Sequence, residues 1–175
     1  LGYYDDAIKS YQQALKIKPN LIQAYHSLGL ALEGRVFSRP APGLPALIGA
    51  ILDKKTLIRP VTVSKAAISL IKLDPEIRSV IDNWKDDQPI NNPLKTIITL
   101  SKSALLLKLM KSCQLPDVDM EMLLTKLRAS VLKNIDALEK TDETKSFLMA
   151  LSMQCFINEF IFSEDTSETE LQANL

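Results

Sequence analysis

Few residues of this sequence form a pattern that could perform chemistry. His26 is the only histidine, and no cysteine lies near it in the sequence to complete a metal site or a catalytic triad. Asp86 and Asp87 are adjacent carboxylates in a polar stretch, and adjacent side chains point apart. We therefore predict no catalytic residue and no metal ligand in this chain.

One polar group lies within the most apolar part of the sequence. Gln154 and Asn158 are four residues apart and share a helix face, with Glu159 next to them. A carboxylate held in an apolar wall binds a proton more readily than usual and could act as an acid. The alternative is a hydrogen-bonded network at the end of a helix, which is the more frequent arrangement.

Neither the glycines nor the cysteines indicate a cofactor. A dinucleotide-type site in a doubly wound fold needs a G-x-G turn after a strand, and no glycines here have that spacing. Cys113 and Cys155 lie in apolar helical sequence and are predicted to be reduced core residues of a cytoplasmic protein, with a disulfide as the alternative. We predict that the chain binds no cofactor.

The elements that would position these residues are clearest at the start of the chain. Residues 1–34 read as a helix, a Pro19-Asn20 corner with Asn20 as the cap of the next helix, and a second helix. Small residues alternate with large ones at fixed spacing, as expected of two helices that approach closely. These positions are Tyr4, Ala7, Tyr11, Ala14, Tyr25, Leu28, Gly29 and Leu32.

This spacing resembles the tetratricopeptide (TPR) repeat, a helical hairpin that occurs in arrays. The resemblance begins inside a repeat, with the second helix of one unit and the first helix of the next. A single unit cannot bury its apolar face, so we expect further units upstream and a longer parent protein. The family implies that a protein or peptide binds in the groove lined by the first helix of a unit. The residues predicted to face that partner are Gln23, His26, Leu30 and Glu33, with simple solvent exposure as the alternative.

The rest of the sequence predicts an all-α fold without a sheet. We divide the chain into the end of a TPR array (1–34), a Pro-rich connector with a short helix (35–60), an all-helical bundle domain (61–162) and an acidic linker or disordered end (163–175). The bundle is predicted to contain helices at 63–73, 75–84, 94–113, from 117 onward and from about 141 to 162. Thr62 or Ser64 is expected to cap the first of these, Asp74 the second and Asp117 the fourth, and the last is expected to start at Thr141. A seam at Met120, Leu124, Leu127, Val131, Ile135 and Leu138 indicates packing within the chain, or alternatively a coiled coil with a partner.

Two further stretches resemble bacterial multidomain proteins in which a TPR array leads through a helical region into an S-adenosylmethionine-dependent methyltransferase-like domain. They are the connector FSRPAPGLPALIGAILDKKTLIRPVTVSKAAISLIKLDP and the closing ALSMQCFINEFIF. The resemblance implies a scaffold region that contacts a following domain of the same chain. The alternative is a regulatory or small-ligand-binding helical unit that itself contributes to a transferase activity.

The composition limits the other partners. Lysine plus arginine equals aspartate plus glutamate at 21 each, so no overall basic field favours nucleic acid. The longest apolar run, 147–162, contains polar residues and is shorter than the roughly 20 residues that cross a bilayer. We predict neither nucleic-acid binding nor a membrane span.

Overall fold

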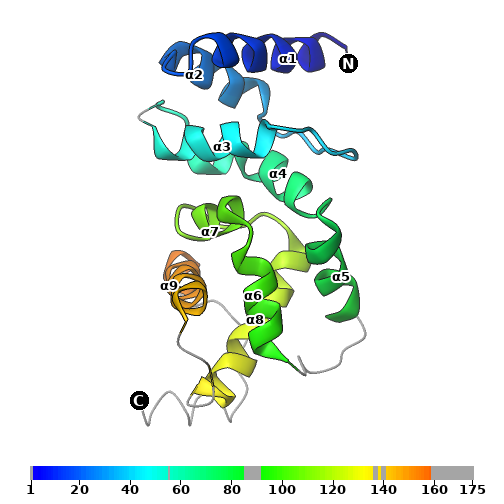
Figure 1. The fold of residues 1–175 in the computed structure, drawn as a ribbon, viewed down its shortest axis with the longest axis vertical. Coiled ribbons are helices and arrows are strands. Elements are labelled where there is room, and N and C mark those ends of the chain that lie inside the picture. The colour runs from blue at the N-terminus through cyan, green and yellow to red at the C-terminus, as the bar shows by residue number, and fades with distance from the viewer. Residues whose placement is uncertain (1, 55, 85–91, 136–137, 139–140, 159–175) are drawn as a thin grey trace.

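The molecule is a stack of helices along one long axis. The computed structural model describes residues 2–54, 56–84, 92–135, 138 and 141–158, and in these residues it contains helices and no strand. The all-α prediction is therefore confirmed for this part of the chain. Figure 1 shows α1 and α2 at one end, α3 and α4 next to them, and α5 to α9 at the other end. The helices are α1 (Gly2–Ile17), α2 (Ile22–Ala31), α3 (Leu44–Asp53), α4 (Pro60–Ile71), α5 (Pro75–Trp84), α6 (Pro93–Ser101), α7 (Ala104–Met110), α8 (Val118–Lys133) and α9 (Asp142–Ile157).

The first two helices pack along each other as the spacing predicted. Leu15 of α1 and Leu28 of α2 are buried in the core. The predicted cap was wrong, because Leu21 is the N-cap of α2 and no side chain accepts a hydrogen bond there. The corner is held instead by the Tyr25 hydroxyl, which donates to the Pro19 carbonyl oxygen over 3.1 Å.

The connector runs back over the hairpin and then onto α4. Phe37 is half-buried against the core, and its backbone N–H donates to Ser69 Oγ of α4 over 2.9 Å. Val36, next to it, is 73% exposed. The guanidinium of Arg35 lies 4.1 Å from the centre of the Tyr4 ring. The cation–π contact ties the connector to α1.

Two helix starts illustrate where local signals succeed and fail. Asp74 caps α5 as predicted, since Oδ1 accepts from the backbone N–H of the residues two and three positions later. The prediction that Thr62 or Ser64 caps the preceding helix was wrong. That helix, α4, begins at Pro60, because proline fixes a helical φ and has no N–H that needs a partner.

The predicted helix 94–113 is two helices. The chain breaks after α6 at Lys102, and Ser103 caps α7 by accepting from the Leu106 N–H over 3.3 Å. The break turns α7 so that it packs against α3 and α4 on one side and against α6 and α9 on the other. The two halves of the stack therefore meet largely through α7.

The seam on α8 faces the interior. Met120, Leu124 and Leu127 are buried, and α8 packs against α5 and α6, which favours packing within the chain over a partner coiled coil. The α-helix ends at Lys133, so the seam does not continue within α8 to Ile135 as predicted.

A charged group joins α4 to the start of α8. Lys72 Nζ lies 2.9 Å from Asp117 Oδ2 and 2.7 Å from Asp119 Oδ2. Partial burial acts to lower the pKa of Lys72, but the hydrogen bonds and the charges of both carboxylates outweigh it and raise the pKa above its ordinary 10.5. Asp117 also caps α8 as predicted, by accepting from the Met120 N–H.

The last helix covers the core with one face only. Helix α9 starts where it was predicted to start, with Thr141 as its cap, and Phe147, Ala150 and Leu151 are buried against α6 and α7. Residues 159–162, which were predicted to extend this helix, lie outside the described part of the chain.

Candidate functional site

The four residues predicted to face a partner do not share one environment. Gln23, Leu30 and Glu33 are exposed, whereas His26 is half-buried. Glu33 lies two residues beyond the end of α2, in the turn that leads to the connector. We call these four residues the α2 face. Its one apolar member, Leu30, is 51% exposed.

His26 is held by a contact that the sequence did not reveal. Its Nδ1 lies 2.8 Å from the backbone carbonyl oxygen of Thr56, in the loop between α3 and α4. Because a carbonyl oxygen only accepts, Nδ1 must carry the proton, and in the neutral ring Nε2 is then an acceptor. Thr56 is itself buried, and its hydroxyl donates to the Ile51 carbonyl oxygen over 3.3 Å. The imidazole therefore has a defined orientation at the edge of the α2 face.

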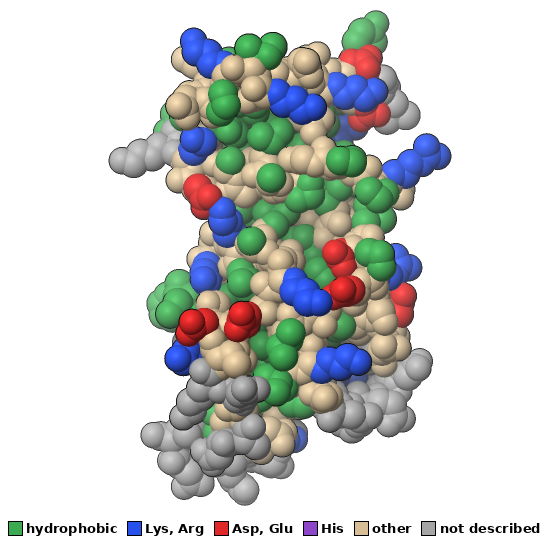
Figure 2. All heavy atoms as spheres, viewed as in Figure 1, with side chains coloured by type: hydrophobic (Ala, Val, Ile, Leu, Met, Phe, Trp, Pro, Cys, Tyr) green, Lys and Arg blue, Asp and Glu red, His purple; other side chains and the backbone are tan. Residues whose placement is uncertain are grey.

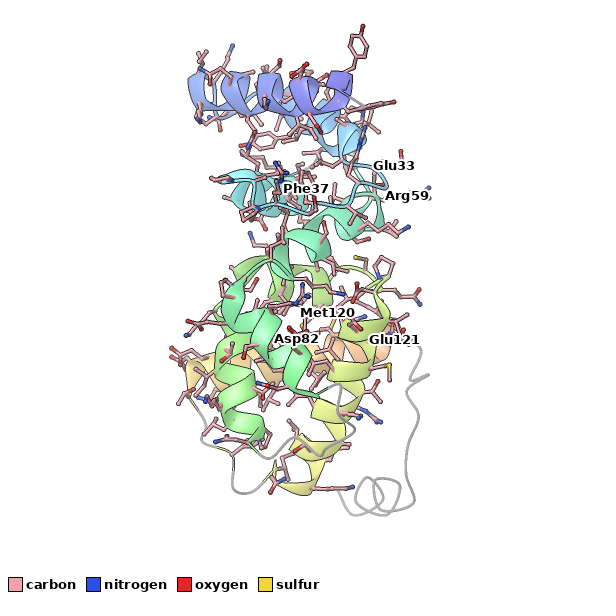
Figure 3. The ribbon with its side chains drawn as sticks, turned by 90° about the vertical axis from the view of Figure 1, so that its right-hand side faces the viewer. Glu33, Phe37, Arg59, Asp82, Met120 and Glu121 are labelled. Carbon is pink, nitrogen blue, oxygen red and sulfur yellow. The ribbon has the colours of Figure 1, made fainter. Side chains whose placement is uncertain are left out.

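The same loop forms one wall of the α2 face. Ile58 lies directly over Gly29 of α2, and a Cβ added to this glycine would stand 2.7 Å from Ile58 Cγ1. Leu57 has a φ of 61° and is 91% exposed, so the loop presents an apolar side chain to solvent in a backbone conformation that non-glycine residues rarely adopt. Figure 3 shows Glu33 and Arg59 at the same edge of the molecule, one after α2 and the other at the start of α4.

The chemistry of the α2 face is that of recognition. The α2 face carries the amide of Gln23, the imidazole of His26, the carboxylate of Glu33 and the exposed apolar side chain of Leu30. Hydrogen-bonding groups around an apolar centre can orient a peptide, but they do not include an activated nucleophile.

A polar residue of α9 forms hydrogen bonds at the C-terminal end of α7. Gln154 is buried, and with its amide nitrogen turned toward α7 it donates to the carbonyl oxygens of Met110 at 2.9 Å and Cys113 at 3.2 Å. Met110 is the last residue of α7 and Cys113 lies in the turn that follows it, where carbonyl groups lack intrahelical partners. For Gln154 and Asn158 the structure therefore favours the helix-end network over an acid site. Glu159 lies outside the described residues, as do Asp86 and Asp87.

The cysteines do not form a reactive pair in the structure. Neither Cys113 nor Cys155 forms a disulfide, and burial raises the pKa of Cys113 to about 11. Cys113 is therefore protonated at neutral pH. Within the described residues no group of three or more histidine, cysteine, aspartate or glutamate side chains could hold a metal ion.

Comparison with known families bears on the first two helices. A family model described as a TPR repeat matches residues 1–34. The α1–α2 hairpin is thus similar to the helices of a TPR array. No curated protein and no solved structure matches the chain. TPR repeats are interaction modules, so the TPR hairpin indicates a role in protein–protein interaction or as a scaffold.

The surface charges and the hydropathy of the described helices are consistent with an interaction module. On the face drawn in Figure 2, acidic and basic side chains are interspersed among apolar ones. None of the described helices combines the length and the apolar character needed to cross a membrane.

Proposed function

We propose that this chain is a non-catalytic interaction region of a larger cytoplasmic protein, and that the α2 face of its TPR hairpin binds a peptide segment of a partner. The observation that carries the proposal is the TPR match combined with the exposure of Leu30 among three hydrogen-bonding side chains. An apolar side chain of the peptide would pack on Leu30, and the Glu33 carboxylate would accept from a basic or N–H group next to it.

The packing of the hairpin supports binding without rearrangement. The loop at Thr56 fixes His26, and Ile58 packs on Gly29, so the side wall of the α2 face is already in place in the free chain. A preformed wall lowers the entropy that is lost when a partner binds.

A surface on the opposite end of the stack supports contact with a following domain. Met149, Met153 and Phe156 are exposed on α9 at intervals of four and three residues, which places them in one stripe. In Figure 2 apolar side chains project at the left edge, where Figure 1 places α9. Exposed apolar stripes of this kind commonly mark interaction surfaces. We propose that a methyltransferase-like domain, suggested by the resemblance of the connector and the closing helix, covers it.

The peptide-binding part of the proposal is tested with selected ligands. Peptides are selected on the full chain from a random display library, and their affinity is then measured by fluorescence polarisation. Leu30→Glu and Glu33→Lys are expected to weaken binding by about tenfold or more, as for loss of a central apolar or charged contact. Ile98→Glu on α6 is the matched control, because Ile98 is similarly exposed at the other end of the stack. Selected peptides that bind all three variants equally well would refute this use of the α2 face.

The methyltransferase association has separate tests. Calorimetric titration of residues 1–175 with S-adenosylmethionine should give no binding heat, because the cofactor site is proposed to lie in another domain. Saturable binding would overturn the non-catalytic assignment. If the parent protein has no strand and glycine-rich turn after Leu175, the association with a methyltransferase is removed while the peptide-binding proposal stands.

A further inference from the structure

A cavity separate from the α2 face lies where the two halves of the stack meet. It has a volume of about 610 Å³ and is bounded by α3, the corner between α4 and α5, and the turn between α6 and α7. In Figure 1 this is the region where α3 lies over α7, with α4 and α5 running down beside them. The size falls within the range of small-ligand pockets, roughly 300–1,000 Å³.

The floor of the cavity is apolar and comes from three helices. Leu70 and Ile71 end α4, Ile77 belongs to the first turn of α5, and Leu105 belongs to α7. All four side chains are buried by their own packing, so the floor exists before any ligand arrives. A ligand with an apolar body would remove the remaining exposed carbon surface from water.

Charged side chains ring the mouth, and most of them are paired. Lys102 Nζ lies 2.6 Å from Glu76 Oε2, and Lys108 forms an ion pair with Asp53 of α3. Lys108 Nζ is also 3.5 Å from the Gly49 carbonyl oxygen. Each lysine at the mouth thus already has a carboxylate partner.

Asp74 is the carboxylate that has no such partner. Its Oδ1 accepts from the backbone N–H groups of Glu76 at 2.9 Å and Ile77 at 3.2 Å, and among the described residues it forms no ion pair. The two N–H bonds fix the carboxylate at the cavity wall. With Asp53 and Glu76 as the other acids and two lysines as the bases, the mouth carries one net negative charge.

We propose that this cavity binds a small amphipathic amine. The apolar body would lie on the floor, and the ammonium group would pair with the unoccupied oxygen of Asp74. An anionic ligand would meet the Asp74 charge and would have to displace Glu76 or Asp53 from a lysine. A neutral ligand would leave Asp74 without a partner. The cavity shares no residue with the α2 face, so the proposal does not rest on peptide binding.

Three probes that share the same apolar group but differ in charge separate the effect of the charge from that of burying the apolar group. Phenylbutylamine, phenylbutanol and phenylbutyrate are titrated into the full chain at neutral pH, with amide chemical shifts recorded for the cavity residues. We expect the amine to bind about fivefold more tightly than the alcohol, as for one partly exposed ion pair, and the carboxylate to bind most weakly. Equal affinities, a preference for the carboxylate, or no saturable shift at the cavity would overturn the proposal.

A matched pair of variants tests the role of Asp74. Asp74→Asn keeps the side-chain oxygen that caps α5 and removes only the charge, so the fold should be retained. It is expected to lower the affinity of the amine to that of the alcohol and to leave the alcohol unchanged. Asp82→Asn is the control, because Asp82 pairs with Arg78 on the outer side of α5 and does not line the cavity. An amine preference that survives in Asp74→Asn would refute the assignment of the ammonium position.

A third variant tests the location. Ala46 of α3 is exposed and lines the cavity, so Ala46→Leu should fill part of it without disturbing the core. We expect all three probes to bind more weakly to this variant. Unchanged affinities would place the probes elsewhere on the molecule and would overturn the proposal.

Discussion

The contact between Gly29 and Ile58 should make a favourable helix substitution unfavourable. Alanine is a better helix former than glycine by about 1 kcal/mol in a helix interior, so Gly29→Ala in the last turn of α2 would ordinarily stabilise the protein. Here the new Cβ would lie 2.7 Å from Cγ1 of Ile58 and 3.1 Å from both its Cγ2 and its Cδ1. All three of these Ile58 atoms lie close to the position of the new Cβ, and isoleucine is stiff at χ1. A rotation about χ1 of Ile58 would therefore replace one clash with another.

The two effects can be weighed against each other. Forcing one extra carbon into a packed contact costs about 1–3 kcal/mol, which exceeds the gain in helix propensity. We therefore expect Gly29→Ala to destabilise the chain by about 1 kcal/mol. For a chain of this size, that loss lowers the melting temperature by roughly 2–4 °C.

Gly49 supplies the matched control. It is also a buried glycine within a helix, but its added Cβ would meet Lys108 Nζ at 3.6 Å, which is an ordinary contact. Gly49→Ala should therefore raise the melting temperature by a similar amount, since only the gain in helix propensity remains. The measurement is thermal and urea unfolding of both variants, followed by circular dichroism.

A second substitution checks the cause. Ile58→Ala removes the side chain that lies over Gly29, so in this background Gly29→Ala should no longer be destabilising. Two results would contradict this explanation: a Gly29→Ala variant as stable as the wild type, or a loss of stability that persists when Ile58→Ala is added. In either case the close approach of the loop to α2 would not be the reason that alanine is unfavourable at position 29.

Two further predictions concern titrating groups. Lys72→Met should cost roughly 1–3 kcal/mol at neutral pH, because it leaves the Asp117 carboxylate without its ammonium partner. The pKa of Lys72 is raised, so this stabilisation is complete below 10.5 and is lost as the pH rises through the raised value. Urea unfolding from neutral pH to pH 11 should show the two proteins converging, and a constant difference would contradict this. In the native chain, iodoacetamide should modify half-buried Cys155 before buried Cys113, whose pKa is about 11. Mass spectrometry gives the order, and faster labelling of Cys113 would contradict its burial.

The features that the sequence predicted correctly are those set by neighbouring residues. The TPR hairpin follows from the spacing of small and large side chains within residues 1–34. The helix starts at Asp74, Asp117 and Thr141 follow from side chains that accept from the N–H group three positions later. Such signals are complete within a few residues, so no knowledge of the tertiary structure is needed.

The features that were missed depend on contacts between distant segments. His26 and Thr56 are thirty residues apart, and no local pattern indicates that one binds the other. The cavity at Asp74 likewise arises only when α3, α5 and α7 come together. The break before α7 did have a local signal, because Ser103 can accept a hydrogen bond from the N–H three residues later. The apolar pattern that continues through it outweighed that signal.

The short helix α7 also has a mechanical consequence. It contacts α3 and α4 on the TPR side and α6 and α9 on the other side, although it has only seven residues. A pulling force applied to the hairpin would therefore be transmitted through α7 to α9. Under such a force the described helices should unfold together in one cooperative step, and not one after another.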